Sequence, residues 1–167
     1  LYQKIYIAHI RTILEENFSN GLYLKRAKEI QQFADKHVKE DVNKLYPYAL
    51  FQKNIDTTVV VDEKRIIGIK ELMGKRTEYL KAHPLLQRTP PVISEVKHVV
   101  EGEKVNISST VEGSPEKVWL CYRYGITGAF QRMEMSGEAP GYLASIENKA
   151  DAQYYVIAEN AQAAALS

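Results

Sequence analysis

A chain of 167 residues with 45% hydrophobic and 26% charged residues has an ordinary globular composition and is long enough for one medium domain or two small ones. No apolar run approaches the roughly 20 residues of a membrane-spanning helix, and the single cysteine, Cys121, excludes an internal disulfide. The net charge of +1 is divided unevenly, because residues 1–90 hold 16 basic and 11 acidic residues and residues 91–167 hold 6 and 10. Basic and acidic residues are interspersed in the first part, as on solvated helices, so we expect no nucleic-acid partner.

The first 88 residues predict helices. A helix is expected from about Leu1 to Asn17, because its apolar residues recur three and four positions apart and spread over about half of the circumference. So wide an arc predicts contacts on more than one side, with Tyr6, Ile10 and Leu14 as candidate interface residues. A few helices alone could not cover it, so we expect a piece of a longer protein whose missing part packs against this arc.

Shorter elements follow this first helix. A second helix is expected from about Leu22 to Lys39, and Pro47 suits the first turn of a short third helix. The β-favouring run Thr57–Val61 predicts an extended connection or a small hairpin. The last helix is expected from about Ile66 to Ala82, and His83-Pro84 ends it because a residue before proline disfavours helical conformation.

The spacing of apolar residues changes at Pro90 and Pro91, from helical periodicity to alternation. A proline pair favours an extended and fairly stiff link. We therefore predict a multidomain chain, α then β, with a helical bundle fragment of about four helices over residues 1–88. A proline-rich linker follows over residues 89–91, and a β-sandwich occupies residues 92–167.

The second part predicts seven short antiparallel strands separated by turn residues. This number in fewer than about 100 residues is typical of an immunoglobulin-like or fibronectin type III-like sandwich. The run Tyr154–Asn160 also resembles the β-sandwich modules that accompany extracellular bacterial enzymes. The expected strands are Val92–Lys97, Val105–Val111, Val118–Tyr124, Phe130–Met135, Tyr142–Ile146, Tyr154–Glu159 and Ala163–Ser167.

Alternation assigns faces to these strands. If Val118 and Leu120 point into the sandwich, then neighbouring residues on two strands make one outer face unusually apolar: Trp119, Cys121, Tyr155 and Ile157. We expect this face to pack against the helical half or a partner. The alternative is that one strand has the opposite register, so that Trp119 belongs to the core.

Three segments of the helical half share one resemblance: Ala8–Phe18, the set Tyr48, Phe51 and Asn54, and Gly68–Leu80. They resemble the C-terminal part of the spore-coat-protein-H (CotH) kinase family. The resemblance implies the helical tail of a domain similar to atypical protein kinases, in a bacterial protein that acts outside the cell or in its envelope. The parent would use ATP and a divalent metal, and the upstream part of its own kinase-like domain would be a partner.

The family's nucleotide-binding lysine and its metal-binding and catalytic carboxylates lie earlier in its chain. No position here matches them, so no catalytic, cofactor-binding or metal-binding residue is assigned. The four histidines, His9, His37, His83 and His98, form no paired metal-ligand motif either. The leading interpretation is a non-catalytic helical tail followed by a sandwich that acts as a spacer or docking module.

The alternative function is a cell-surface binding module whose sandwich recognises a polysaccharide or a protein. Tyrosines of the sandwich could form a sugar-binding platform, although tyrosines of this kind more often pack in a core with a solvated hydroxyl. The candidates are Tyr122, Tyr124, Tyr142, Tyr154 and Tyr155. A third interpretation is an enzyme whose site is built from these residues alone.

Overall fold

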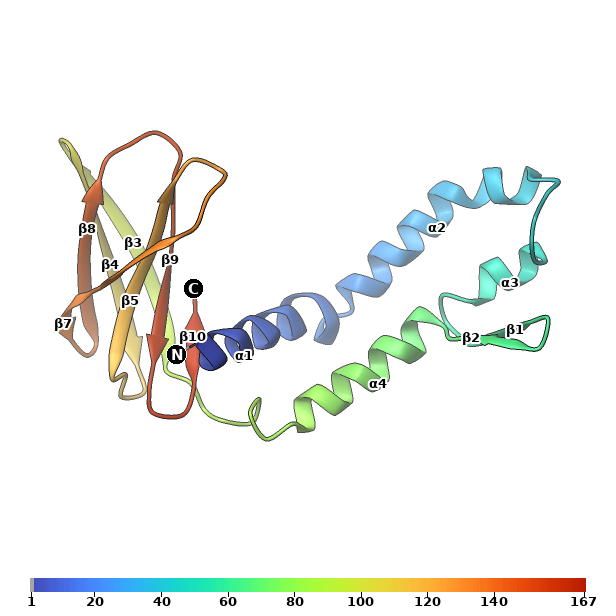
Figure 1. Ribbon diagram of the computed structural model, residues 1–167, viewed down its shortest axis with the longest axis horizontal. Helices are drawn as coiled ribbons and strands as arrows, with labels where there is room; N and C mark the ends of the chain where they lie inside the picture. Colours follow the sequence, from blue (N-terminus) through green and yellow to red (C-terminus); the bar gives the residue numbers. More distant parts are fainter. Residues whose placement is uncertain (1) are drawn as a thin grey trace. The chain divides into compact units, whose positions relative to one another are not determined.

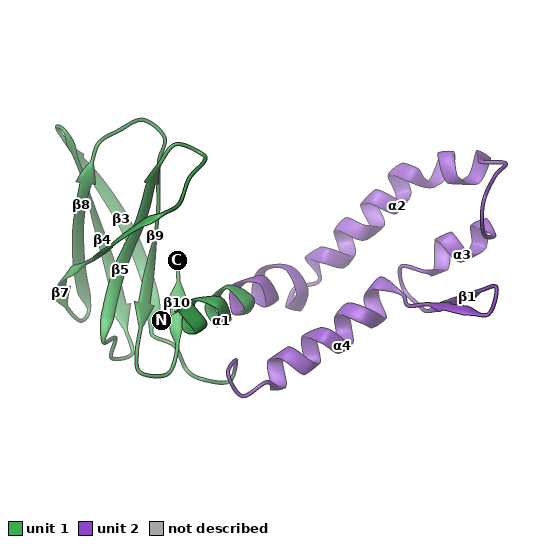
Figure 2. Ribbon diagram, in the orientation of Figure 1, with its two compact units in different colours: residues 1–10, 87–167 green, residues 11–86 purple. Residues whose placement is uncertain are grey.

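The computed structural model describes residues 2–167, which form four α-helices, one π-helix and ten strands in three antiparallel sheets (Figure 1). The chain is therefore a mixture of helices and mostly antiparallel sheet. It divides into two compact units, one of residues 11–86 and one that joins the residues up to Ile10 to residues 87–167 (Figure 2). We call them the helical unit and the β unit.

The helices and the hairpin before residue 88 follow the predicted order along the chain, although α1 up to Ile10 belongs to the β unit. The first helix, α1, covers Tyr2–Ile13 and continues into a π-helical turn, η1, over Leu14–Ser19. Gly21 then adopts a left-handed backbone (φ 76°) before the second helix begins. The remaining elements are α2 (Leu22–Glu40), α3 (Tyr48–Lys53), β1 (Val59–Val61), β2 (Lys64–Ile66) and α4 (Ile69–Ala82).

The β1–β2 hairpin changes one predicted boundary. Ile66 was expected to start the last helix, but it pairs with Val59 in the hairpin, and α4 starts at Ile69. Gly68 allows this tight approach, because a Cβ at this position would lie 2.6 Å from the backbone carbon of Thr57. The hairpin and the start of α4 are therefore joined backbone to backbone.

The helical unit has a small core. Leu14, Ile55 and Val59 are its buried large apolar residues, whereas α2, α3 and α4 contain no buried residue. Large apolar side chains on these helices are instead exposed, and Phe33 on α2 is the most exposed of them, at 86%. Helical periodicity alone therefore overestimates how much of each apolar stripe is covered within this unit.

The β unit consists of two four-stranded sheets with the strand orders β3-β4-β8-β7 and β10-β9-β5-β6. The prediction of seven strands is wrong by one strand. β7 forms where a turn was expected, because Gly137, at φ 130°, lets the chain approach β8 closely enough to pair. The strands are β3 (Val92–Glu101), β4 (Lys104–Glu112), β5 (Lys117–Tyr124), β6 (Gln131–Glu134), β7 (Ser136–Glu138), β8 (Gly141–Glu147), β9 (Ala152–Glu159) and β10 (Ala164–Leu166).

The core of the β unit lies between its two sheets. Alternate residues of β4 and β8 meet alternate residues of β5 and β9, and Ile107, Leu120 and Val156 are completely buried there. The predicted inward faces of these strands are confirmed, and the reversed register is wrong. Trp119, Cys121, Tyr155 and Ile157 consequently stand on the opposite face of the β5–β9 pair.

The residues predicted as a linker are packed onto the β unit. Pro91 is fully buried, and its Cα lies 3.3 Å from the position of a Cβ on Gly113. The side-chain amide of Asn160 donates a hydrogen bond of 3.1 Å to the carbonyl of Thr89. Residues 89–91 therefore belong to the β unit. In the described part of the chain, no helix is long and apolar enough to cross a membrane.

Candidate functional site

The first residues of α1 cover part of the outer face of the β10-β9-β5-β6 sheet. Ala8 is buried in one cluster with Cys121, Ile157 and Ala164, and Ile5 packs at its border. Apolar groups of a helix and of a sheet thus exclude water from a second core within the β unit. We call this contact the α1 seam.

A buried polar cluster closes one end of the α1 seam. Lys4 Nζ donates to Glu159 Oε2 at 3.2 Å and to the carbonyl of Asn160 at 2.6 Å. Trp119 Nε1 donates to Glu159 Oε1 at 3.1 Å, so both carboxylate oxygens have a partner although Glu159 is only 7% exposed. A buried charge is tolerated when it is paired and hydrogen-bonded in this way.

The pKa of Glu159 reflects these opposing influences. Burial alone would raise the pKa of the carboxyl, but hydrogen bonds from Trp119 and Lys4, together with the charge of Lys4, outweigh it and lower the pKa. Glu159 is therefore ionised at neutral pH, and its charge holds helix to sheet. Its partners leave no oxygen free for acid–base chemistry on a substrate.

The predicted interface residues are separated in the structure. Trp119, Cys121, Tyr155 and Ile157 lie together at the α1 seam, with Trp119 and Tyr155 partly buried. On α1, Tyr6 is 66% exposed and Ile10 is partly buried, and Leu14 is buried in the helical unit. That these seven residues form an interface with another domain or a partner stays a prediction.

The helical residues that cover this face, Ile5 and Ala8, were missed by the sequence analysis. Ile5 and Ala8 are three positions apart, a spacing that places two residues on the same face of a helix. The larger apolar residues Tyr2 and Tyr6 drew the prediction to another face of α1, although both are exposed to solvent.

Cys121 and Tyr155 do not provide a reactive pair. Burial raises the pKa of the Cys121 thiol, so that it stays protonated at neutral pH. Burial and the hydrogen bond with Cys121 raise the pKa of Tyr155 to about 12. Both side chains fill space at the α1 seam.

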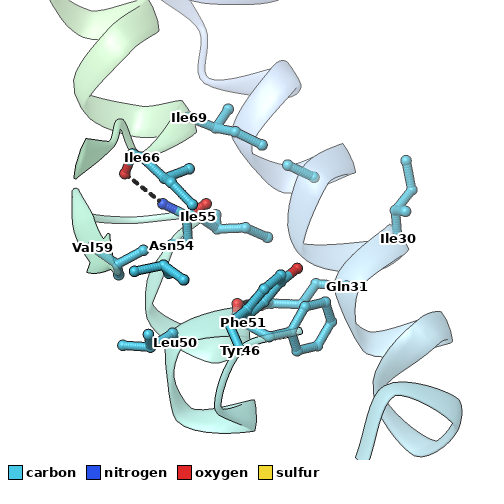
Figure 3. A pocket seen from close by; sticks show the side chains of 12 residues that line it. Ile30, Gln31, Tyr46, Leu50, Phe51, Asn54, Ile55, Val59, Ile66 and Ile69 are labelled. Atoms are coloured by element: carbon cyan, nitrogen blue, oxygen red, sulfur yellow. Dashed lines mark hydrogen bonds between the residues drawn. The ribbon is translucent and has the colours of Figure 1, made fainter. Parts of the chain in front are cut away.

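An apolar pocket of about 360 Å³ opens in the helical unit, between α2, α3 and the β1–β2 hairpin. Figure 3 shows side chains from these elements turned toward a shared space. Two amides brace its wall: Gln31 donates to the carbonyl of Phe51 at 2.7 Å, and Asn54 donates to the carbonyl of Ile66 at 3.0 Å. The lining residues are Ala27, Ile30, Gln31, Tyr46, Leu50, Phe51, Asn54, Ile55, Val59, Val61, Ile66 and Ile69.

The lining of this pocket is mostly apolar. No charged side chain is among its lining residues, and the amides of Gln31 and Asn54 are already bonded to backbone carbonyls. The pocket can therefore accept an apolar group, and the phenol of Tyr46 is the one hydroxyl that its lining supplies. The pocket was not predicted from the sequence, because its wall combines one face of α2 with the β1–β2 hairpin, and periodicity does not show which elements lie next to each other.

The five candidate tyrosines of the sandwich do not form an exposed strip. All of them are partly buried, and Tyr122, Tyr142 and Tyr154 pack at the border of the core between the sheets. Tyr154 also contacts His98, whose Nδ1 lies 2.6 Å from the tyrosine hydroxyl. Among residues 2–167, no group of three His, Cys, Asp or Glu side chains stands close enough to hold a metal ion.

Comparisons with known proteins add little to this geometry. No family model matches the chain, and no curated protein matches it. A solved structure, the crystal structure of a Br derivative of BhCBM56, is similar with a TM-score of 0.39 and 14% identity, over 48% of this chain and 89% of that one. Similarity this low carries no argument about the function of the chain.

Proposed function

We propose that the chain is a non-catalytic C-terminal part of a CotH-kinase-like bacterial protein that acts outside the cell or in its envelope. The helical half is the tail of the kinase-like domain and packs against the upstream part of that domain. The sandwich is an immunoglobulin-like or fibronectin type III-like module that serves as a spacer or docking unit.

The observation that carries this proposal is the uncovered apolar surface of the helical unit. Its helices α2, α3 and α4 bury no residue, yet they expose Ile30, Phe33 and Tyr79, and the apolar pocket stands open beside α2. Burying one such side chain stabilises a fold by about 1.5–3 kcal/mol. A surface of this kind favours a role in packing against more protein.

The residues that carry the resemblance have structural tasks here, which supports the non-catalytic interpretation. The hydroxyl of Tyr48 donates to Asp35, and the side chain of Asn54 bonds the carbonyls of Thr57 and Ile66. Gly68 is required by the close approach of Thr57. These contacts fix α2, α3 and the hairpin with respect to one another, and none of them leaves a group directed at a substrate.

The strand orders support the immunoglobulin-like class of the sandwich. In chain order, the first, second, sixth and fifth strands of the β unit form one sheet, and the eighth, seventh, third and fourth form the other. A seven-stranded immunoglobulin-type sandwich places its strands in the same way, and the β unit differs from it by one additional strand, β6, beside β5.

Hydrogen exchange tests the proposal. In the chain of 167 residues, we expect amides of α2 and α4 to exchange far faster than amides of β4 and β5, because few apolar contacts oppose local opening of the helices. In a longer chain that includes the kinase-like region, the same helical amides should become protected. Equal protection of helices and strands in the short chain would refute the packing role, and binding of ATP with magnesium by the short chain would refute the non-catalytic one.

A further inference from the structure

Beyond the α1 seam, the outer face of the β10-β9-β5-β6 sheet carries two arginines stacked on aromatic rings. The guanidinium carbon of Arg132 lies 4.6 Å from the ring centroid of Trp119, and that of Arg123 lies 4.5 Å from the ring centroid of Phe130. Arg132 pairs in register with Cys121, two residues from Arg123 on β5. The two arginines are therefore diagonal neighbours on one face, with a backbone separation of about 7–8 Å.

Neighbouring groups hold Arg123 in place. Its Nε donates to Gln153 Oε1 at 2.9 Å, and its Nη1 donates to the carbonyl of Gly128 at 3.0 Å. The ring of Phe130 is itself braced by Tyr155, 5.0 Å away between centroids. A planar guanidinium fixed in this manner loses little rotational freedom when it binds a ligand.

Neither guanidinium has a carboxylate partner within the described residues. Arg123 and Arg132 form no ion pair there, and Glu134, two residues from Arg132 on β6, is engaged by Lys117 at 3.4 Å. Each guanidinium has five N–H donors in a planar fork, and Arg123 uses only two of its nitrogens in hydrogen bonds. Arg132 is exposed and Arg123 is partly exposed, so solvent and a ligand can reach this pair of guanidinium groups.

We propose that this patch, formed by Arg123, Arg132, Phe130 and Gln153, binds the carboxylates of an acidic polysaccharide. The guanidinium fork matches a carboxylate in bidentate geometry. The two arginines lie side by side on an open sheet face, where an extended polymer with repeated carboxylates can contact both at once and gain affinity from the second contact.

A protein partner fits this patch less well. Stable protein interfaces need a buried apolar centre, and Phe130, 36% exposed, is the one large apolar side chain that the patch itself exposes. The inference rests on the docking role proposed above for the sandwich. It is independent of the kinase-like lineage of the helices.

Amide shifts of the isotopically labelled full chain, titrated with tetragalacturonate at low salt, test the inference. We expect shifts centred on residues 121–132 and 153–155, with a dissociation constant on the order of 1 mM. Arg132→Gln should weaken binding about fivefold, because one charged bidentate contact is lost. Arg132→Lys should weaken it less. Arg65→Gln, the same change of charge on the exposed hairpin strand β2, should leave the affinity unaltered.

Several outcomes would overturn the inference. One is the absence of shifts at the patch, and another is equal weakening by Arg132→Gln and Arg65→Gln, which would indicate general charge attraction. Equally tight binding of the methyl-esterified sugar would exclude carboxylate recognition, and equally tight binding of a tetraglutamate peptide would favour an acidic protein segment. If Arg132→Gln disturbs the fold, the sugar and its methyl ester still decide the matter on the unaltered chain. Hydrogen exchange in the helices is not expected to respond to the sugar. A failure of the chain to bind the sugar would therefore leave the proposed packing role of the helices standing.

Discussion

The two units of this chain use apolar residues in opposite ways. In the β unit, side chains such as Ile107, Leu120 and Val156 are sealed between two sheets, and a second cluster lies under α1. In the helical unit, most large apolar side chains of α2 and α4 remain in contact with solvent. The comparison shows that similar hydrophobic content can specify a self-contained core in one region and a surface for further packing in the other.

Two spectroscopic signals report on the unfolding of the two units. Trp119 is the single tryptophan of the chain and lies in the β unit, so its fluorescence reports on that unit. Far-ultraviolet circular dichroism is dominated by the helices, and α2, α3 and α4 all belong to the helical unit.

The largest effect is expected from the core of the β unit. Leu120→Ala should lower the free energy of unfolding measured by tryptophan fluorescence in urea by about 3 kcal/mol, because it removes a fully buried side chain. Phe33→Ala, at an exposed position of α2, should change the helical transition by less than about 0.5 kcal/mol. Comparable losses from both variants would show that Phe33 is covered and would erase the contrast between the units.

A pair of glycines in the helical unit gives the next effect. Gly68→Ala should destabilise the hairpin and the start of α4 by about 2 kcal/mol, since the new Cβ would lie 2.6 Å from backbone carbon of Thr57. Gly74→Ala, within α4 and with no atom near the added Cβ, should instead stabilise the helix by about 0.5–1 kcal/mol. Helical circular dichroism during thermal unfolding separates the two, and a stabilising Gly68→Ala would contradict the close approach.

The polar end of the α1 seam should give a smaller loss. Glu159→Gln leaves Lys4 beside a neutral partner in a buried place and should cost the β unit about 1–2 kcal/mol in fluorescence-detected unfolding. Glu134→Gln breaks the exposed pair with Lys117 and should cost less than about 0.5 kcal/mol. If the two variants lose the same free energy of unfolding, the contact of α1 with the sheet does not depend on Glu159.

The smallest effect is a dependence on pH that comes from the same carboxylate. The pKa of Glu159 is lower in the folded chain than its ordinary value of 4.5, so its contribution to stability is present above about pH 4.5. This contribution is lost as the pH falls through the pKa that Glu159 has in the folded chain. Fluorescence-detected stability should therefore fall less steeply with acid in Glu159→Gln than in the unaltered chain, and parallel profiles would contradict this assignment.

The sequence predicted most of the β unit, because alternation is a local signal there. Val105, Ile107 and Val111 face the core as expected. The extra strand β7 was missed because Ser136 and Gly137 resemble a turn, and their pairing with β8 depends on a backbone approach that side-chain patterns do not encode.

The candidate sites were harder to predict. Periodicity gave Leu14 and Tyr6 equal weight, but a π-helical turn buries the first in the helical unit and the second is exposed on α1. The arginine patch depends on cross-strand neighbours, Arg132 with Trp119 and Arg123 with Phe130, that are far from obvious along the chain. Local spacing identifies faces, whereas partners across a sheet require the register.

The α1 seam limits how this β unit can be transferred between proteins. A cassette excised at the proline pair and fused to another protein would lack Lys4, Ile5 and Ala8, and would present Ile157 and Cys121 uncovered. Gene fusions that keep the module soluble would therefore have to carry the N-terminal helix with it or supply a substitute. The structural unit is accordingly discontinuous in the chain, although the pattern of the sequence changes at a single point.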